Sequence, residues 1–218
     1  MTQEAFATTD LRLEKVSISL GGKKLLELDE VVKPGEVLSV MGPSGSGKSS
    51  LLAFIAGFLD PAFKAEGRVC LGDKSITDLP PEERSVGLLF QDALLFPHMS
   101  VAQNLAFAIP KSVASKAKRN QLVLEALALT ELDGMAERDP ATLSGGQKSR
   151  IALMRVLLAK PRALLLDEPF SKLDAELRNQ IRQFVFTEAG KRNLPVLLVT
   201  HDEQDVSAAK GKIIKLEH

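Results

Sequence analysis

The chain has 218 residues, of which 44% are hydrophobic and 26% are charged, and its 28 lysines and arginines balance its 28 aspartates and glutamates. This composition is typical of a globular protein with one large core, and the zero net charge gives no support to nucleic acid as a partner, which usually requires a basic surplus. The longest apolar run, Leu51 to Leu59, is too short to cross a bilayer, and the first ten residues lack the basic and apolar regions of an export signal. We therefore expect any membrane role to depend on a partner.

Short apolar segments separated by glycine turns predict strands in the first ninety residues. The candidates are Leu13–Leu20, Leu25–Val32, Val37–Met41, Gly67–Leu71 and Val86–Phe90. The first alternates apolar and polar residues and ends at Gly21-Gly22, as expected of a half-buried strand. The single cysteine, Cys70, excludes an internal disulfide, and its place in a strand predicts a buried, inert thiol.

From residue 92 to residue 160 the pattern becomes helical, with candidate helices over Asn120–Leu129 and Gly145–Ala159. Strand-type runs then return at Ala163–Leu166, Val196–Thr200 and Lys212–Leu216. Between the first two of these runs, Asp174 can cap an amphipathic helix that closes at Gly190. Strand-rich ends around a helical insert predict a parallel α/β fold.

Residues 42–49 fit the phosphate-binding loop pattern G-x-x-x-x-G-K-[ST] between a predicted strand and a predicted helix. The loop and the residue after it are Gly42, Pro43, Ser44, Gly45, Ser46, Gly47, Lys48, Ser49 and Ser50. Its glycines let successive backbone N–H groups point at an anion, and the helix start adds a positive dipole end. Lys48 would add charge at the terminal phosphates, and Ser49 would offer a hydroxyl to Mg²⁺. The pattern predicts that the chain binds a nucleoside triphosphate, and the alternative is a glycine-rich turn that happens to precede Lys-Ser.

Two acids, Asp167 and Glu168, follow the apolar run Ala163–Leu166. Ligands of open parallel sheets bind outside the carboxyl ends of the strands, so we expect both acids to face the phosphate loop. Mg²⁺ needs few carboxylates and keeps waters, so Asp167 suffices as a metal ligand. Glu168 can orient or deprotonate an attacking water. A strand that ends in a solvated acidic turn is the alternative interpretation.

Leu143-Ser144-Gly145-Gly146-Gln147 is the second informative stretch. Ser144 as the cap and Gln147 three residues later form a capping box, which is one interpretation. Two glycines in a first helical turn cost about 1 kcal/mol each relative to alanine. Capping does not require them, whereas the close approach of an anion does. The sequence therefore predicts two anion-binding helix starts, of which the second has no evident ligand of its own.

The order of these motifs resembles that of the ATP-binding cassette (ABC) ATPases over essentially the whole chain. Residues 143–147 match the signature sequence of that family, Gln91 resembles its Q-loop glutamine, residues 171–174 its D-loop, and His201 its switch histidine. The resemblance implies an α/β fold with a P-loop NTPase core of mixed, mainly parallel sheet, an N-terminal antiparallel β-subdomain and an inserted α-helical subdomain. Residues 1–218 would form one ABC ATPase domain, with the nucleotide-binding core in residues 1–91 and 161–218 and the helical signature subdomain in residues 92–160.

The resemblance also implies ATP and Mg²⁺ as cofactors. The phosphate loop would hold ATP, while Ser49, Asp167 and Gln91 would surround the metal. The catalytic residues would be Glu168, which polarises the attacking water, His201, which holds the γ-phosphate geometry, and Gln91.

Family members pair head to tail, so the resemblance implies a homodimer. Ser144, Gly145, Gly146 and Gln147 would then complete the ATP site of the partner subunit, and Asp174 would belong to the D-loop. A dimer in which each subunit completes the other's site satisfies two-fold symmetry.

Leu20 departs from the family pattern, which usually stacks adenine on an aromatic residue before the Gly-Gly turn. The chain contains neither tyrosine nor tryptophan. Because stacking a base on an aromatic ring contributes about 1–3 kcal/mol, we expect weaker ATP affinity and less base selectivity than in relatives with that residue. Lys172 is a second departure, since small residues are frequent at its place in the D-loop.

Residues 81–110 resemble bacterial uptake cassettes, which implies the ATPase subunit of an importer on the cytoplasmic face of the inner membrane. Separate transmembrane subunits would dock near Gln91 to Val101, and a periplasmic or extracellular solute-binding protein would deliver the solute. An exporter cassette, a non-transport cassette acting on DNA or ribosomes, and a catalytically dead regulator are the alternatives. Non-transport cassettes usually carry a coiled-coil insert or a second cassette, and a catalytically dead regulator would lack Glu168 or His201.

Overall fold

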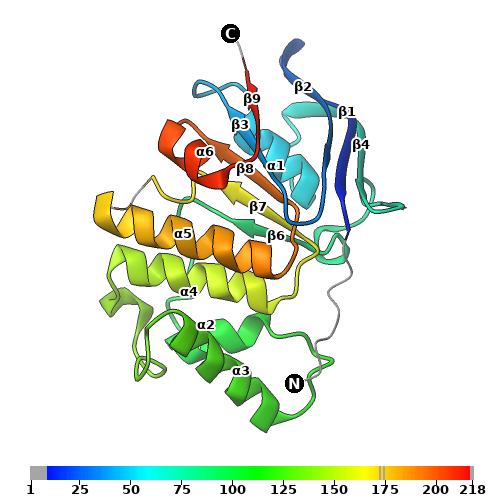
Figure 1. The fold of residues 1–218 in the computed structure, drawn as a ribbon. Coiled ribbons are helices and arrows are strands. Elements are labelled where there is room, and N and C mark those ends of the chain that lie inside the picture. The colour runs from blue at the N-terminus through cyan, green and yellow to red at the C-terminus, as the bar shows by residue number, and fades with distance from the viewer. Residues whose placement is uncertain (1–8, 172, 174, 217–218) are drawn as a thin grey trace. The chain divides into compact units, whose positions relative to one another are not determined.

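A computed structural model describes residues 9–171, 173 and 175–216, which divide into two compact units (Figure 1). The first unit holds the residues up to Leu88, Arg162–Glu168 and the residues from Phe184 onward. The second holds Leu89–Pro161 and Pro169–Gln183. The subdomain limits expected from the sequence stay a prediction; this division falls near them and adds residues 169–183 to the helical unit.

An antiparallel sheet of four strands, in the order β2-β1-β4-β5, forms one layer of the first unit. Its strands are β1 (Leu11–Leu20), β2 (Lys23–Val32), β4 (Phe63–Leu71) and β5 (Lys74–Ser75). Apolar side chains of β1 at Leu11, Leu13, Val16 and Ile18 are fully buried on its inner face. This sheet confirms the expected N-terminal antiparallel part of the fold.

A bulge interrupts β1 at Lys15, whose φ is 48°. The β1–β4 register shifts there, and a Cβ on Gly67 would lie 2.3 Å from the Lys15 carbonyl oxygen, so only glycine fits opposite the bulge. The predicted strand over Gly67–Leu71 was therefore too short, because Gly67 accommodates the bulge instead of starting the strand. Beyond it β4 continues to Phe63, which lies opposite Leu20.

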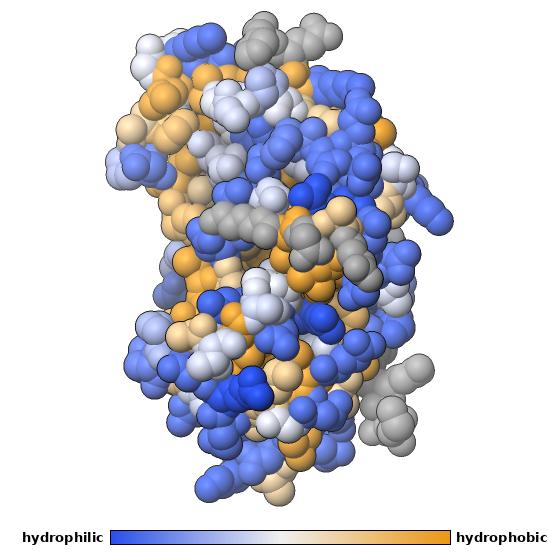
Figure 2. All heavy atoms as spheres, turned by 90° about the vertical axis from the view of Figure 1, so that its left-hand side faces the viewer, coloured by the Kyte–Doolittle hydropathy of each residue, from blue (hydrophilic) through white to orange (hydrophobic). Residues whose placement is uncertain are grey.

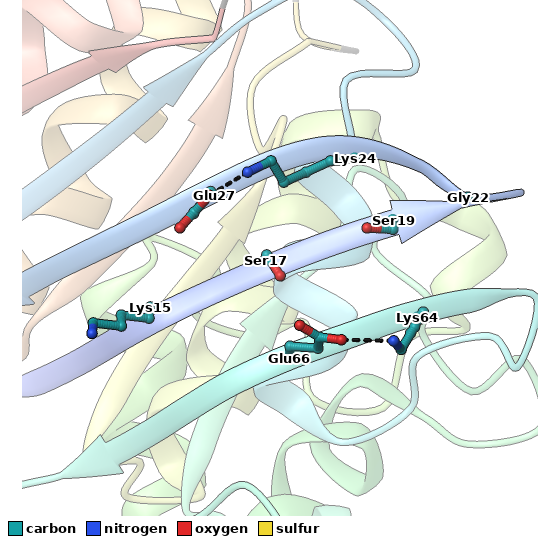
Figure 3. Close-up of a pocket in the computed structure, with 8 residues that line it drawn as sticks. All are labelled: Lys15, Ser17, Ser19, Gly22, Lys24, Glu27, Lys64 and Glu66. Atoms are coloured by element: carbon teal, nitrogen blue, oxygen red, sulfur yellow. Dashed lines mark hydrogen bonds and ion pairs between the residues drawn. The ribbon is translucent and has the colours of Figure 1, made fainter.

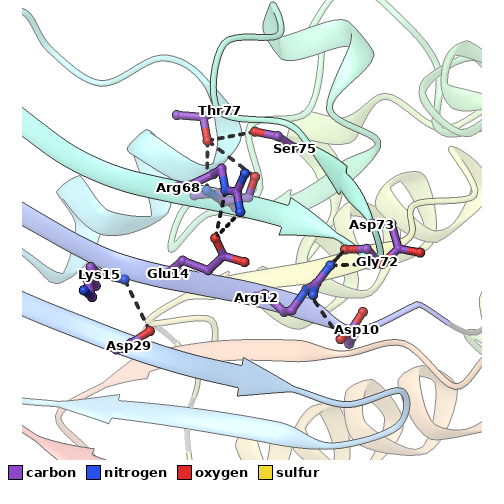
Figure 4. A network of polar contacts seen from close by, with 11 residues as sticks. Asp10, Arg12, Glu14, Lys15, Asp29, Arg68, Gly72, Asp73, Ser75 and Thr77 are labelled. Atoms are coloured by element: carbon purple, nitrogen blue, oxygen red, sulfur yellow. Dashed lines mark hydrogen bonds and ion pairs between the residues drawn. The ribbon is translucent and has the colours of Figure 1, made fainter.

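The outer face of this sheet is polar. Figure 3 shows Lys15, Ser17 and Ser19 there, between the ion pairs Lys24–Glu27 and Lys64–Glu66. At the other end of the sheet, Figure 4 shows a second set of charged contacts: Arg68 with Glu14, and Arg12 with Asp10 and Asp73. Ion pairs on the surface contribute little to the free energy of unfolding. The polar face therefore makes the sheet compatible with solvent but adds little to its stability.

The second sheet has five strands in the order β6-β7-β8-β3-β9, and β8 pairs in parallel with β3 and β7, as β9 does with β3. The strands are β3 (Val37–Met41), β6 (Val86–Leu89), β7 (Ala163–Asp167), β8 (Val196–Thr200) and β9 (Lys212–Lys215). All five residues of β8 are buried, as expected of a parallel strand covered on both faces. The sheet confirms the predicted parallel α/β core.

The helices are α1 (Lys48–Ala56), α2 (Val101–Ala108), α3 (Lys116–Leu129), α4 (Gly145–Leu158), α5 (Ala175–Lys191) and α6 (Glu203–Ala209), with 3₁₀ turns at Pro81–Glu83 and Pro140–Thr142. In the first unit α1 contacts β4 of one sheet and β7 of the other, and a hydrogen bond from Ser49 to Asp167 places the start of α1 beside the carboxyl end of β7. In the second unit α2, α3 and α4 pack on one another.

No helix in the described part of the chain combines the length and apolarity that a membrane crossing requires. On the face drawn in Figure 2, hydrophilic and hydrophobic residues are interspersed.

The helices differ from the sequence-based expectation in several places. The helix expected over Asn120–Leu129 begins earlier, at Lys116, and α2 was not predicted as a separate helix. Gly190 does not close α5, which continues to Lys191. The short helix α6 was not predicted, although Asp202 caps it by accepting a hydrogen bond from the Gln204 N–H at 2.8 Å. Its seven residues are too few for a periodic pattern to appear. The proposed cap of α5, Asp174, lies outside the described residues, as does Lys172.

Candidate active site

The phosphate loop turns tightly from β3 into α1 through left-handed glycines. Gly45 and Gly47 have φ values of 82° and 87°, a conformation that residues with a Cβ rarely adopt. A Cβ on Gly47 would also lie 3.1 Å from the Leu25 Cβ and 3.2 Å from the Leu26 Cδ2, so β2 packs directly against the loop. Gly47 is the residue before the helix and gives α1 no side-chain cap. The first N–H groups of α1 are thus available to an anion rather than to a local side chain.

Lys48 folds its side chain back over the loop. Its Nζ donates hydrogen bonds to the carbonyl oxygens of Gly42 at 2.8 Å and Pro43 at 2.7 Å, and lies 3.4 Å from the Ser46 Oγ. Burial lowers the pKa of Lys48, while the carboxylates of Glu168 and Asp167 act in the opposite direction. These hydrogen bonds hold the ammonium group of Lys48 over the loop, where the predicted phosphates would bind.

Ser49 and Asp167 meet as the sequence predicted. The Ser49 Oγ donates a hydrogen bond to the Asp167 Oδ1 at 3.1 Å, although the two residues lie 118 positions apart. Burial raises the pKa of Asp167, and Glu168 adds to that effect, whereas Ser49 and Lys48 oppose it. One hydroxyl and one carboxylate suit Mg²⁺, which binds oxygen ligands and keeps several waters. The described residues contain no group of three or more His, Cys, Asp or Glu side chains placed for a metal.

Glu168 lies next to His201 at the ends of β7 and β8. The His201 Nδ1 is 3.0 Å from the Glu168 Oε1, and Glu168 adopts a left-handed φ of 44°. A non-glycine residue in that region is strained, and such strain concentrates at functional sites. The Glu168 N–H donates to the Val199 carbonyl at 2.9 Å, which fixes the strained peptide against β8.

A buried hydrogen-bond network formed by Thr200, Asp202 and Asp205 holds the backbone on both sides of His201. Thr200 and Asp205 are 1% and 3% exposed, and the Thr200 Oγ1 donates to the Asp205 Oδ2 at 2.8 Å. The same hydroxyl accepts the Asp202 N–H at 3.0 Å. The residues on both sides of His201 are thereby held while its ring stays exposed.

A pocket of about 300 Å³ opens at the phosphate loop. It is lined by Leu20, Leu25, Ser44, Gly45, Gly47, Lys48, Ser49, Ser50, Phe63 and Glu168. Eight of these were predicted as site residues from the sequence. Leu25 and Phe63 were missed, and the only signal that could have found Phe63 is the alternation Phe63-Lys64-Ala65-Glu66, which extends β4 beyond Gly67.

Gln91 lies in the second unit, where its Nε2 donates to the Ser171 Oγ at 3.0 Å. The predicted Q-loop glutamine thus contacts the first residue of the predicted D-loop. Its expected role beside Mg²⁺ stays a prediction, and so does that of Asp174, which is outside the described residues.

The signature stretch begins α4 with a complete capping box. The Ser144 Oγ accepts the Gln147 N–H at 3.3 Å, and the Gln147 Oε1 accepts the Ser144 N–H at 2.9 Å. A Cβ on Gly146 would lie 2.1 Å from the Leu177 Cδ2 of α5, whereas a Cβ on Gly145 would meet no atom within 4 Å. Close helix packing therefore explains the glycine at position 146. Packing gives no reason for the glycine at position 145.

Comparison with known proteins gives consistent matches. A family model described as ABC transporter matches residues 25–171. The uncharacterized ABC transporter ATP-binding protein YnjD of Escherichia coli K12 is 48% identical over 199 residues, which are 91% of each chain. The putative 2-aminoethylphosphonate import ATP-binding protein PhnT of Salmonella typhimurium LT2 is 38% identical over 94% of this chain. The Fe(3+) ions import ATP-binding protein FbpC of Agrobacterium fabrum is 39% identical over 88% of it.

The two import proteins are longer, since the matches span 56% of PhnT and 53% of FbpC. Among solved structures, a dimeric post-hydrolysis state of the ATP-binding cassette MJ0796 bound to ADP and Pi superimposes with a TM-score of 0.78 at 31% identity. The superposition covers 95% of this chain and 94% of that one.

Proposed function

The chain belongs to the ABC transporter family and is an ATPase of that family, and from this we propose that it is the ATP-hydrolysing subunit of a bacterial importer. It would power solute movement through separate transmembrane subunits. The observation that carries the enzymatic part is the meeting of three distant segments. Lys48, Ser49 and Glu168 line one pocket, Asp167 accepts the Ser49 hydrogen bond beside it, and His201 lies 3.0 Å from Glu168.

Binding of ATP rests on the phosphate loop. The uncapped start of α1 and the Lys48 ammonium hold the phosphates, and the Ser49 hydroxyl and the Asp167 carboxylate hold Mg²⁺. When bound, the metal neutralises charge that develops on the phosphate oxygens. The remaining contribution of these residues is to fix the terminal phosphate in one orientation.

Hydrolysis rests on Glu168 and His201. The Glu168 carboxylate accepts a hydrogen bond from the attacking water and aligns it with the terminal phosphate. His201, 3.0 Å from that carboxylate, restrains its orientation. Positioning and charge stabilisation do most of the work in phosphoryl transfer, so a small displacement of either side chain should reduce turnover strongly.

The active assembly is a head-to-tail homodimer. The dimeric state of the MJ0796 cassette supports dimerisation. Ser144, Gly145, Gly146 and Gln147 at the start of α4 complete the ATP site of the partner subunit, with Asp174 of the D-loop beside it. ATP then links the two subunits, and hydrolysis releases them.

The import direction is supported by the names of PhnT and FbpC, both import ATP-binding proteins. Membrane subunits dock near Gln91 to Val101 and hold the chain on the cytoplasmic face of the membrane. A periplasmic or extracellular solute-binding protein supplies the solute, and no nucleic acid takes part. An exporter would use the same nucleotide chemistry, so the partners decide between the two.

Glu168→Gln tests the enzymatic assignment. The amide cannot act as a base, so we expect kcat to fall by about 10²–10⁴-fold while ATP binding persists and an ATP-bound dimer accumulates in size-exclusion chromatography. Glu66→Gln, on the polar outer face of β4, is the matched control and should keep full turnover. Unchanged turnover in Glu168→Gln would show that the role of Glu168 is wrong.

Purification from native membranes tests the transport assignment. Membrane subunits together with a solute-binding protein are the expected partners of the intact chain. Recovery of ribosomes or DNA-processing proteins would instead support a non-transport cassette, and recovery of membrane subunits without a solute-binding protein would favour an exporter.

A further inference from the structure

An aromatic side chain lines the pocket at the phosphate loop, and no sequence motif points to it. Phe63, the first residue of β4, lies in the same pocket as Lys48 and the phosphate loop. In the β1–β4 register it is directly opposite Leu20. Residues opposite each other in antiparallel strands project from the same face, so both side chains border the pocket together.

Leu25 completes this apolar corner. The β1–β2 register passes from Ile18 opposite Leu26 to Ser19 opposite Lys24, so Leu25 is the extra residue of a bulge. Its Cβ would lie 3.1 Å from a Cβ built on Gly47. The corner therefore adjoins the start of α1 directly, without an intervening layer of side chains.

We propose that Leu20, Leu25 and Phe63 form the nucleobase site and that the Phe63 ring stacks on the base. This inference rests on the proposed ATPase function of the pocket. The lining combines an ammonium group, a hydroxyl and backbone N–H groups from the phosphate loop and the start of α1 with three apolar side chains from β1, β2 and β4, one of them flat. A nucleoside triphosphate has a matching charged end and a flat ring at the other end.

The apolar corner also bears on base selectivity. Leucine and phenylalanine side chains carry no hydrogen-bond donors or acceptors, and stacking tolerates different bases because each has a π-face. ATP and GTP should therefore bind with dissociation constants within about threefold of each other. Both purines should bind more tightly than UTP, whose single ring offers less stacking surface.

The inference opposes the expectation drawn from Leu20 alone. If position 20 lacked its stacking partner, Leu20→Tyr should tighten ATP binding by about tenfold or more. If Phe63 already stacks on the base, Leu20→Tyr should change the dissociation constant by less than about twofold, because the second ring finds its surface occupied. A tenfold gain in Leu20→Tyr would overturn the inference.

Binding measurements on Phe63 variants provide the main test. The probes are ATP, GTP and inorganic tripolyphosphate, each with Mg²⁺, measured by calorimetry on the full chain. Phe63→Leu keeps an apolar residue in β4 but removes the ring, and it should raise the ATP and GTP dissociation constants by about tenfold. Binding of tripolyphosphate, which has no base, should not change. Phe63→Tyr should bind ATP as the unaltered chain does, and Phe58→Ala, which removes an exposed ring after α1, is the matched control.

The outcomes separate this inference from the proposed function. Wild-type affinity for ATP in Phe63→Leu would overturn the nucleobase site and leave the ATPase assignment standing. Equal weakening of ATP and tripolyphosphate would also overturn it, because the substitution would then act on the phosphate loop. Failure of the unaltered chain to bind either probe would contradict the proposed function itself. Transferred nuclear Overhauser effects from the adenine protons to a phenyl ring, lost in Phe63→Leu, would confirm the stacking directly.

Discussion

Two helices of this molecule begin in opposite ways. At α1 the preceding residue is a left-handed glycine without a side-chain cap, and the first helical residue is a lysine. At α4, Ser144 and Gln147 satisfy each other's N–H groups in a capping box before any ligand arrives. The first N–H groups of a helix have no acceptor within the helix. At α4 the capping box provides acceptors for some of them, whereas at α1 no side chain does and a bound anion would have to. This difference fits the proposal that α1 binds the phosphates of its own nucleotide, while α4 only contacts the γ-phosphate bound by a partner subunit.

The largest expected effect concerns the lysine at the start of α1. Lys48→Ala removes the ammonium that lies over the Gly42 and Pro43 carbonyls, so we expect ATPase turnover to fall by about 10²–10³-fold. Steady-state phosphate release measures this. Lys64→Ala, an exposed lysine on the outer face of β4, is the control and should be unaffected. Normal turnover in Lys48→Ala would mean that α1 is not the catalytic helix start.

The next largest effect is the change in stability when each of the two glycines at the start of α4 is replaced, which tests whether each glycine is needed for helix packing. Gly146→Ala forces a methyl group against Leu177, and overpacking of this kind costs about 1–3 kcal/mol in the free energy of unfolding. Gly145→Ala has room for its methyl group and should stabilise the chain by about 0.5–1 kcal/mol through helix propensity. Urea unfolding of the two variants compares adjacent glycines directly.

A double-mutant cycle with Leu177→Ala sharpens this result. The cost of Gly146→Ala should shrink when Leu177 is already truncated, because the clash disappears. If turnover also recovers in the double variant, Gly146 serves packing alone. If stability recovers and turnover does not, Gly146 also approaches the partner's phosphate.

A smaller effect follows from the cap of α4. Ser144→Ala should cost about 1 kcal/mol of stability because it removes the hydrogen bond that the Gln147 N–H donates to the serine side chain. Ser144→Asp preserves capping but places a negative charge where the partner's γ-phosphate would approach. It should keep the thermal stability of the unaltered chain and lose ATP-dependent dimerisation, and retention of both would argue against the proposed dimer contact.

The smallest effect concerns how the free energy of unfolding depends on pH through Asp167, which accepts a hydrogen bond from Ser49 of α1. Burial holds the pKa of Asp167 above its ordinary value of 3.8, so the folded chain without nucleotide binds more protons there than the unfolded chain. Stability from this group then falls as pH rises through the raised pKa, and Asp167→Asn should remove that loss. We expect Asp167→Asn to be more stable than the unaltered chain at pH 8, and the difference to disappear at a pH below the ordinary value of 3.8. Urea unfolding at several pH values measures it, and a difference that grows toward low pH would contradict the sign.

Sequence reasoning worked best where a motif fixes both chemistry and position. Ser49 and Asp167 were expected to meet because parallel strands gather their carboxyl ends, and the hydrogen bond between them confirms it. The strands β3 and β8 were predicted with their observed limits because apolar runs bounded by turn residues are unambiguous.

The misses have tertiary causes. The contact of Gly146 with Leu177 depends on how α4 packs on α5, which no local pattern encodes. Gly67 looked like the start of a strand, whereas its missing Cβ makes room for a bulge in a neighbouring strand. As a result the first part of β4, and Phe63 with it, was left out of the predicted site.

The bulge at Lys15 also shifts the alternation of inward and outward side chains along β1 by one residue. The inward side chains are at odd positions through Leu13 and at even positions from Val16 onward. A regular strand would have turned the rest of its apolar residues toward water and aligned Leu20 with the residue before Phe63. Which side chains border the pocket is therefore decided at Lys15, in the middle of β1 and five residues before Leu20. A change at Gly67 should alter base binding without any contact to the ligand.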